Sequence, residues 1–337
     1  MKSFAVCACA VLAIFTNVSF AQDASGSASA GKTTESGGPP HPAKTQSQEE
    51  NWTELNAAKS GLYKSRIKAW VLGKSDFPDY TSELVRVEWR EGDPVDLYVL
   101  RPHGIAKPPV VLYLYGFPSD DYRFKQETWG KSVTKGGFAA VGFVSALTGQ
   151  RYNMRPMREW FVSELQESLG SSVHDVQMIL DYLTMRGDVD TTHAAMLGEG
   201  SGGTIAILAA AADSRIGFVD ALNPWGDWPE WLKESQVIPE KERANYLKPE
   251  FLTKVARLDP IAYLPQLDAK RIRIEQVVGD MATPKSVQVK FSVGAPAASV
   301  IQYEDTKAEI QAWTKQNWWI KTQLHPSPSP STKAPTE

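Results

Sequence analysis

The sequence predicts an α/β fold, a three-layer α/β/α sandwich around a mainly parallel sheet with an antiparallel N-terminal hairpin and a helical cap insertion. Residues 84–100 are two β-rich runs joined by a tight turn, which is typical of a hairpin. Residues 108–118 form a continuous apolar run of the kind that lies buried on both faces of a parallel sheet. From there on, apolar runs alternate with helix-compatible stretches, and this alternation indicates parallel strands with helices on both faces.

The first half of the ordered region contains the hairpin and two buried strands. The hairpin turn is Glu91-Gly92-Asp93-Pro94, a favourable tight-turn sequence. The elements that follow are a strand in 108–118, a helix over 124–135 ended by Gly136-Gly137, a strand over 138–144 and a mostly helical stretch over 159–185 interrupted near Gly170.

The second half continues the alternation with one interruption. Residues 226–258 are polar, rich in tryptophan and helix-compatible, and we interpret them as the cap insertion. The other expected elements are strands at 194–197, 216–221, 272–278 and 299–303 and helices over 204–212 and 307–322.

The N-terminus has the features of a secretory signal peptide. A charged start, the apolar run from Phe4 to Phe15 and the Ser19-Phe20-Ala21 site predict cleavage after Ala21. Both cysteines, Cys7 and Cys9, lie inside this segment, so the mature chain has no thiol or disulfide. We therefore expect a secreted or periplasmic protein that is not held in a membrane after cleavage.

Two segments have the composition of disordered chain. Residues 22–50 contain no large apolar side chain and predict a flexible linker, and the Pro–Ser repeats of 325–337 predict an extended tail. The domain between them spans 51–324.

Composition limits the classes of partner. The formal net charge is −3 with both signs interspersed and no Lys/Arg block, which disfavours a nucleic-acid partner. The mature chain has no HExxH motif, no cysteine and no pair of histidines at helical spacing, so we expect neither a metal site nor a cofactor. A small molecule or a peptide remains as the expected ligand, and the oligomeric state is open.

The glycine-rich stretch LGEGSGGTIA at 197–206 is the main candidate for an active-site turn. It follows an apolar run and precedes a helix. With VVLYLYGFP (110–118) and RIRIEQVVGDMATP (271–284), it makes the chain from Leu84 to Thr322 resemble the α/β-hydrolase superfamily, in particular dienelactone-hydrolase-like and prolyl-peptidase-like domains.

This resemblance implies a strained nucleophile elbow at the turn, an oxyanion hole made by the backbone N–H groups of Phe117 and Ser201, and an acidic triad member near Asp280. The nucleophile position falls on Gly200, which has no side chain. The triad histidine is also missing, since YEDTKAEI (303–310) occupies its place. The resemblance therefore favours a catalytically degenerate binding or accessory protein, and the alternative is an ester or peptide hydrolase that uses Ser201.

A dinucleotide site is a second alternative. Gly198 to Gly203 also satisfy G-x-G-x-x-G, and Asp220 follows 22 residues after Gly198, where a carboxylate could bind ribose hydroxyls. Against this, the fingerprint normally sits at the first strand of its domain. The turn has a third interpretation, in which its glycines serve only close packing of a helix on the sheet.

Aromatic and cationic side chains near the expected mouth are candidates for ligand contacts. Arginines and tryptophans can grip an acidic or aromatic ligand, or they can simply pair with carboxylates and pack the cap on the core. The candidate ligand-binding residues are Tyr115, Arg151, Arg155, Trp225 and Trp228.

Overall fold

The computed structural model describes residues 50–62, 66–117, 121–147, 164–268, 271–309 and 319–324. The predicted signal peptide, most of the predicted linker and the tail 325–337 lie outside these ranges. Among the helices of the described ranges, none is both long enough and apolar enough to cross a membrane.

The described chain forms a nine-stranded sheet in the order β1-β2-β3-β5-β4-β6-β7-β8-β9. Its first three pairings, up to β3 with β5, are antiparallel and the rest are parallel. The strands are β1 (Lys68–Asp76), β2 (Tyr80–Glu88), β3 (Val95–Pro102), β4 (Pro109–Leu114), β5 (Ala139–Gly142), β6 (Asp190–Glu199), β7 (Ile216–Leu222), β8 (Ile272–Val277) and β9 (Val300–Tyr303).

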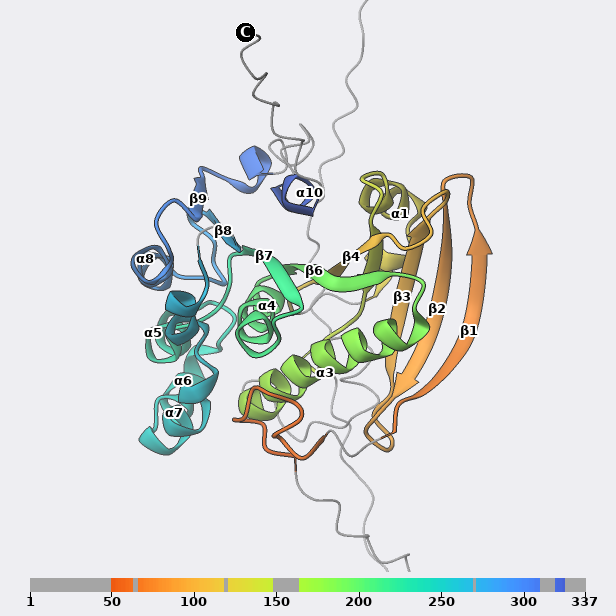
Figure 1. Ribbon diagram of the computed structural model, residues 1–337. Coiled ribbons are helices and arrows are strands. Elements are labelled where there is room, and N and C mark those ends of the chain that lie inside the picture. The colour runs from red at the N-terminus through yellow and green to blue at the C-terminus, as the bar shows by residue number, and fades with distance from the viewer. Residues whose placement is uncertain are drawn as a thin grey trace, which may run out of the picture. The chain divides into compact units, whose positions relative to one another are not determined.

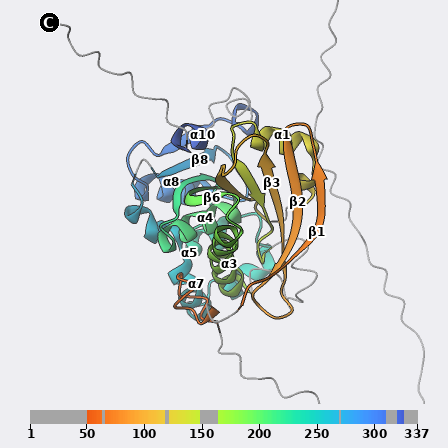
Figure 2. The same cartoon turned by 45° about the vertical axis from the view of Figure 1, so that its right-hand side comes forward.

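Helices cover both faces of this sheet (Figures 1 and 2). The helix α1 (Glu127–Thr134) and the short α10 (Trp319–Leu324) lie on one face, while α3 (Leu165–Arg186) and α4 (Ser201–Ala212) lie on the other. The strand β4 alternates between the two layers: Val110 and Leu112 belong to the α3/α4 core and Val111 and Tyr113 to the α1/α10 core. The three-layer sandwich predicted from the sequence is confirmed.

The predicted hairpin is confirmed as β2 and β3, with Val87 opposite Val95. On this pair Arg86 donates two hydrogen bonds to its cross-strand neighbour Asp96, at 2.7 and 2.9 Å. The strand β1, which pairs with β2 at the edge of the sheet, was not predicted. All nine of its residues are exposed, so burial imposed no alternation of apolar and polar residues that the sequence could reveal.

The expected break of the long helix at Gly170 is wrong, because α3 runs without interruption through this position. A Cβ at Gly170 would lie 2.2 Å from the carbonyl oxygen of Trp52. The glycine therefore serves the close passage of the N-terminal segment over the helix, not a turn. The helix α8 (Lys285–Gly294) was also missed.

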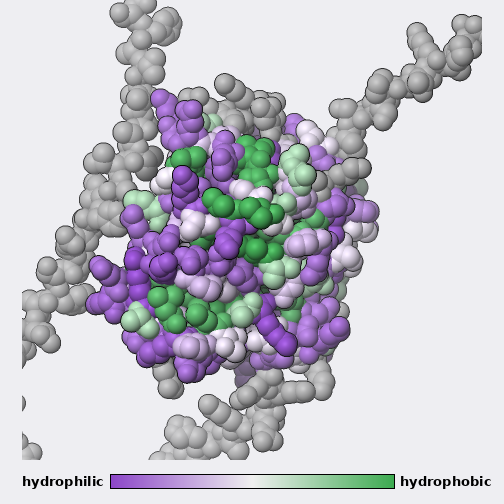
Figure 3. Space-filling model, turned by 90° about the vertical axis from the view of Figure 1, so that its left-hand side faces the viewer, coloured by the Kyte–Doolittle hydropathy of each residue, from purple (hydrophilic) through white to green (hydrophobic). Residues whose placement is uncertain are grey.

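The stretch predicted as a cap insertion contains three short helices, α5 (Trp228–Glu234), α6 (Glu240–Tyr246) and α7 (Pro249–Val255), followed by the 3₁₀ turns η3 (Ala256–Leu258) and η4 (Pro260–Gln266). On the side of the molecule opposite to β1, apolar patches are interspersed with hydrophilic side chains (Figure 3).

Glu50, the last residue of the predicted linker, is tied into the core. Its carboxylate accepts hydrogen bonds from Arg90 at 2.6 and 2.7 Å and lies 2.5 Å from Nδ1 of the fully buried His174. Arg90 also pairs with Asp175 on α3. Glu50 is therefore part of the folded domain, because an ion-pair network holds this residue in place.

Candidate active site

The glycine-rich turn joins β6 to α4 through a single residue. Gly200 has φ +54° and ψ −120°, a conformation that side-chain-bearing residues adopt only under strain. Its N–H donates to the carbonyl of Leu222 at 2.8 Å, and α4 begins at the next residue, Ser201. This is the sharp strand-to-helix turn of a nucleophile elbow.

Neighbouring glycines let backbone segments approach closely at this turn. A Cβ on Gly202 would lie 2.0 Å from the carbonyl oxygen of Leu114, and a Cβ on Gly116 would lie 2.6 Å from that of Glu199. The interpretation of the glycines as packing residues is therefore correct for these positions, and it applies together with the elbow interpretation.

Ser201 is fully buried at the start of α4. Its Oγ accepts a hydrogen bond of 3.0 Å from the backbone N–H of Phe117. Phe117 and Ser201, the two residues predicted to supply oxyanion donors, are thus adjacent. The Ser201 side chain, however, already accepts the N–H of Phe117.

Comparison with known proteins gives the fold of the chain. No family model and no curated protein matches the chain. Among solved structures it is similar to acetyl xylan esterase 1 from Thermoanaerobacterium sp. JW/SL YS485, with TM-score 0.60 and 15% identity over 77% of this chain and 88% of the other. It is also similar to an acetyl xylan esterase from Paenibacillus sp. R4, with TM-score 0.60 and 17% identity over 82% and 96% of the two chains. A glucuronoyl esterase from Solibacter usitatus matches with TM-score 0.51 and 15% identity over 77% and 86%.

The chain has the α/β-hydrolase fold. At these identities the similarity establishes the fold, and the chemistry has to be judged from the side chains at the elbow.

The α/β-hydrolase elbow of this chain has no hydroxyl at its corner, since Gly200 occupies the nucleophile position. The three histidines in the described ranges all bond elsewhere: His103 to Asp76 and Thr81, His174 to Glu50 and Glu54, and His193 to Thr192. His41 and His325 lie outside those ranges. No hydrogen bond joins Ser201 to a histidine among the residues described here.

Carboxylates surround the elbow instead. Burial raises the pKa of Glu199, the residue before Gly200, against the opposing charge of Arg123, and the charge of Asp280 raises it further. Asp280 follows β8, which runs parallel to β6 through β7, so it lies at the same edge of the sheet as Gly200. Its Oδ1 accepts the Thr283 N–H at 2.6 Å, and burial raises its own pKa.

Glu309 lies in the stretch where the family carries its histidine. It is 5% exposed, and burial, followed by the charges of Glu275 and Glu199, raises its pKa to about 7. Sequence reasoning noted the stretch but did not select this residue. The only available signal was an acidic residue at the position of an expected base.

Arg123 is the cation whose charge acts on Glu199 and Glu309. Its guanidinium lies 4.0 Å from the centre of the Tyr115 ring and 3.7 Å from a carboxylate oxygen of Glu199. The Tyr115 hydroxyl accepts a 2.7 Å hydrogen bond from Trp129. The ring of Tyr115, a predicted ligand-binding residue, therefore already contacts a cation of the same chain.

The other predicted ligand-binding residues differ in their placement. Trp225 and Trp228 are each 1% exposed and pack on Trp231, at ring-centre distances of 4.6 and 5.7 Å. The structure thus places them in the core, where tryptophan contributes mainly buried apolar area. Arg151 and Arg155 lie outside the described residues.

Asp220 does not serve a dinucleotide. It is 2% exposed and accepts hydrogen bonds from Arg273 at 2.6 and 3.2 Å. A carboxylate buried in an ion pair cannot reach ribose hydroxyls, and β6 is a central strand, not the first of its domain. In addition, no group of three potential metal ligands occurs among the residues that the structure describes.

Proposed function

We propose that this protein is an exported α/β-hydrolase-fold protein that binds a small molecule or peptide at its elbow without hydrolysing it. The observation that carries the proposal concerns two consecutive residues, Gly200 and Ser201. The corner that would present a nucleophile has no side chain, and the next hydroxyl accepts the N–H of Phe117 at 3.0 Å. Attack on a carbonyl needs free oxyanion donors, and this hydrogen bond occupies the N–H of Phe117, one of the two expected donors.

The electrostatics of the elbow support the same proposal. A serine becomes nucleophilic when a histidine accepts its proton, and the groups around this elbow are carboxylates with raised pKa values. Glu199 and Glu309 in their neutral forms are hydrogen-bond donors, which suits ligand binding better than general-base work on a serine. Export rests on the predicted signal peptide of residues 1–21.

A second candidate function is ester or peptide hydrolysis by Ser201. The observation that favours it is the similarity of the fold to proteins described as acetyl xylan and glucuronoyl esterases. In that case the Ser201 side chain must rotate away from Phe117, and a base outside the described residues must reach it.

A panel of p-nitrophenyl esters and peptides, assayed with the purified protein and with Ser201→Ala, separates the two candidates. We expect no turnover above buffer by either protein. The control variant is Ser235→Ala, which removes an equally buried hydroxyl that donates to Ala282 at 2.7 Å, far from Gly200 along the chain. Turnover that disappears in Ser201→Ala but persists in Ser235→Ala would establish the hydrolase instead.

A further inference from the structure

Among the described residues no strand pairs with the outer side of β1, and this edge of the sheet exposes several apolar side chains. In both ribbon views it is the outermost strand on its side of the molecule (Figures 1 and 2). Three consecutive large side chains on it are exposed: Trp70 by 46%, Val71 by 62% and Leu72 by 50%. An uncovered edge of this kind is a template for pairing with another strand.

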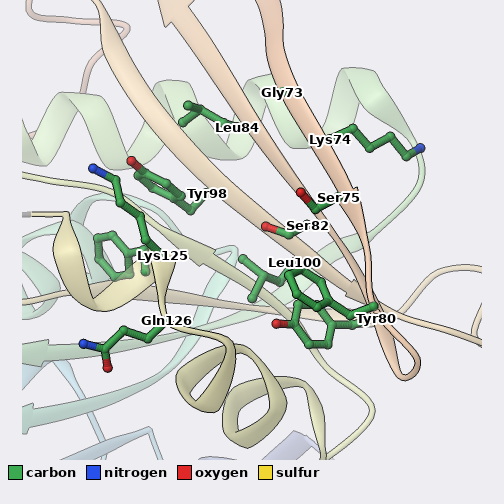
Figure 4. Close-up of a pocket in the computed structure, with 12 residues that line it drawn as sticks. Gly73, Lys74, Ser75, Tyr80, Ser82, Leu84, Tyr98, Leu100, Lys125 and Gln126 are labelled. Atoms are coloured by element: carbon green, nitrogen blue, oxygen red, sulfur yellow. The ribbon is translucent and has the colours of Figure 1, made fainter.

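A small cavity lies beside this edge. It measures about 210 Å³ and lies between the first three strands and the segment 124–126 (Figure 4). The buried rings of Tyr80, Tyr98 and Phe124 contribute to its lining. At the β1 side it is lined by Gly73, Lys74 and Ser75, and a Cβ built on Gly73 would meet nothing within 4 Å. Gly73 therefore leaves space at the wall of the cavity, on a strand at the edge of the sheet.

Trp70 and Gly73 point to the same face of the sheet. The pairing with β2 has a bulge between Val71 and Gly73, so that Trp70 lies opposite Arg86 and Gly73 opposite Leu84. Arg86 and Leu84 are two residues apart on β2 and share a face, and residues opposite each other in an antiparallel pair share a face as well. Without the bulge, residues 70 and 73 would point to opposite faces.

We propose that two copies of this chain associate by antiparallel pairing of their β1 edges, with Trp70 of each copy covering Gly73 of the partner subunit and filling its cavity. In this register Trp70 lies opposite the partner's Gly73, and Val71 lies opposite the partner's Leu72. The twofold axis passes between the two Val71–Leu72 pairs. The contact is isologous, because each copy supplies one projecting ring and one cavity. An aromatic ring lying over a cross-strand glycine is a favourable pair in sheets.

The charges of β1 are compatible with a second copy in this register. Lys68 faces Ser75 and Lys74 faces Ala69, so no like charges are opposed. Each lysine also has a counter-ion on its own chain, Lys68 with Glu88 at 3.1 Å and Lys74 with Glu83 at 3.2 Å. Lysines and a bulge normally protect an edge strand from arbitrary partners. A second copy has the same bulge at the centre of its β1, so the two strands deviate from regular pairing at the same place. An unrelated strand lacks this bulge.

Sedimentation velocity of the purified protein from about 1 to about 200 µM, a range that brackets micromolar affinity, tests the proposal. We expect a dimer whose population rises with concentration. Trp70→Ala removes the ring and Gly73→Leu fills the cavity, and each variant should shift the protein to monomer at all concentrations. Gly73→Leu is compatible with the monomer fold, since its Cβ has open space and the backbone is not in the left-handed region.

The control is Val293→Ala, which trims an 80% exposed apolar side chain on α8 and should leave the dimer intact. Circular dichroism of all variants verifies that the fold is retained. A wild-type protein that stays monomeric over the whole range would overturn the proposal, and so would dimers that persist in both Trp70→Ala and Gly73→Leu. The test is independent of the elbow chemistry, because β1 contributes nothing to the elbow.

Discussion

Gly200 combines the backbone of a nucleophile elbow with the absence of a nucleophile. Its φ of +54° and ψ of −120° would strain any other residue, and glycine relieves that strain. In the proposed binding protein this corner needs no reactive side chain, and glycine is the residue that fits its backbone with least strain. A bound carbonyl or carboxylate could accept the Phe117 N–H only if the Ser201 hydroxyl released it.

Replacing Gly200 with serine tests this interpretation. We expect Gly200→Ser to lower the free energy of unfolding by about 1–3 kcal/mol, the usual cost of a side chain in such a backbone conformation. The new Cβ would also lie 3.3 Å from Nε1 of Trp225. Urea denaturation gives the stability, and the ester panel should show no turnover because no histidine accompanies the new hydroxyl. Ester hydrolysis by this variant would mean that a base is present.

Glu309 makes stability depend on pH near neutrality. Its pKa of about 7 in the folded protein lies above the ordinary value of 4.5. The folded state therefore favours the protonated carboxyl of Glu309. The stability that this group contributes is fully present below pH 4.5 and is lost as the pH rises through 7.

Glu309→Gln, which cannot ionise, should raise the melting temperature at pH 8 by roughly 2–4 °C and change it little at pH 4.5. Thermal unfolding at the two pH values measures this, with the exposed Glu240→Gln as control. An equal shift at both pH values would contradict the assignment.

At the scale of elements, the strands β7 and β8 carry a buried ion-pair cluster under α10. Arg273 on β8 pairs with Asp220 on β7 and with Glu275, and the two carboxylates are almost completely buried. Burial raises the pKa of Asp220, the charge of Glu275 raises it further, and Arg273 opposes both. The guanidinium also lies 5.6 Å from the ring centre of Trp319, which connects the cluster to α10.

Removing the cation should destabilise the protein strongly. Arg273→Met retains most of the side-chain volume but leaves two buried carboxylates without their counter-ion, so we expect a loss of about 3–5 kcal/mol at pH 8. The loss should shrink at pH 5, because Asp220, whose pKa in the folded protein is about 7, is then protonated. Urea unfolding at both pH values measures the difference. A loss that does not depend on pH would show that Arg273 acts through packing alone.

At the scale of the whole molecule, the contacts of Glu50 join the start of the described chain to α3 and to the turn between β2 and β3. Burial alone would raise the pKa of Glu50, but hydrogen bonds and charges from Arg90 and His174 outweigh it and lower the pKa to about 2. A lowered pKa means that the contribution of Glu50 to stability is present above pH 4.5 and is lost as the pH falls toward 2.

Glu50→Gln should therefore reduce the free energy of unfolding by about 3 kcal/mol at pH 7, the lower end of what breaking a buried ion pair costs. The wild type and the variant should approach each other below about pH 3. Unfolding monitored by circular dichroism at several pH values tests this. If the difference persists at low pH, the side chain acts through its neutral hydrogen bonds.

The fold was predictable because its signals are local. Continuous apolar runs such as 108–118 show burial on both faces, and the turn 91–94 shows a hairpin. Elements without such a signal were missed, as β1 was, because every one of its residues is exposed. Gly170 was misread because its packing partner, Trp52, lies far away in sequence.

The sequence by itself determined the hydrolase-like order of strands and helices, the position of the elbow, and the absence of a side chain at its corner. Only the tertiary structure decided that the Ser201 hydroxyl accepts the Phe117 N–H, that Asp220 is buried against Arg273, and that Glu309 stands among the carboxylates near the elbow. The physical reason is distance along the chain. Secondary structure is set by neighbours within a few residues, whereas the protonation and hydrogen bonding of a site depend on groups that only folding brings together.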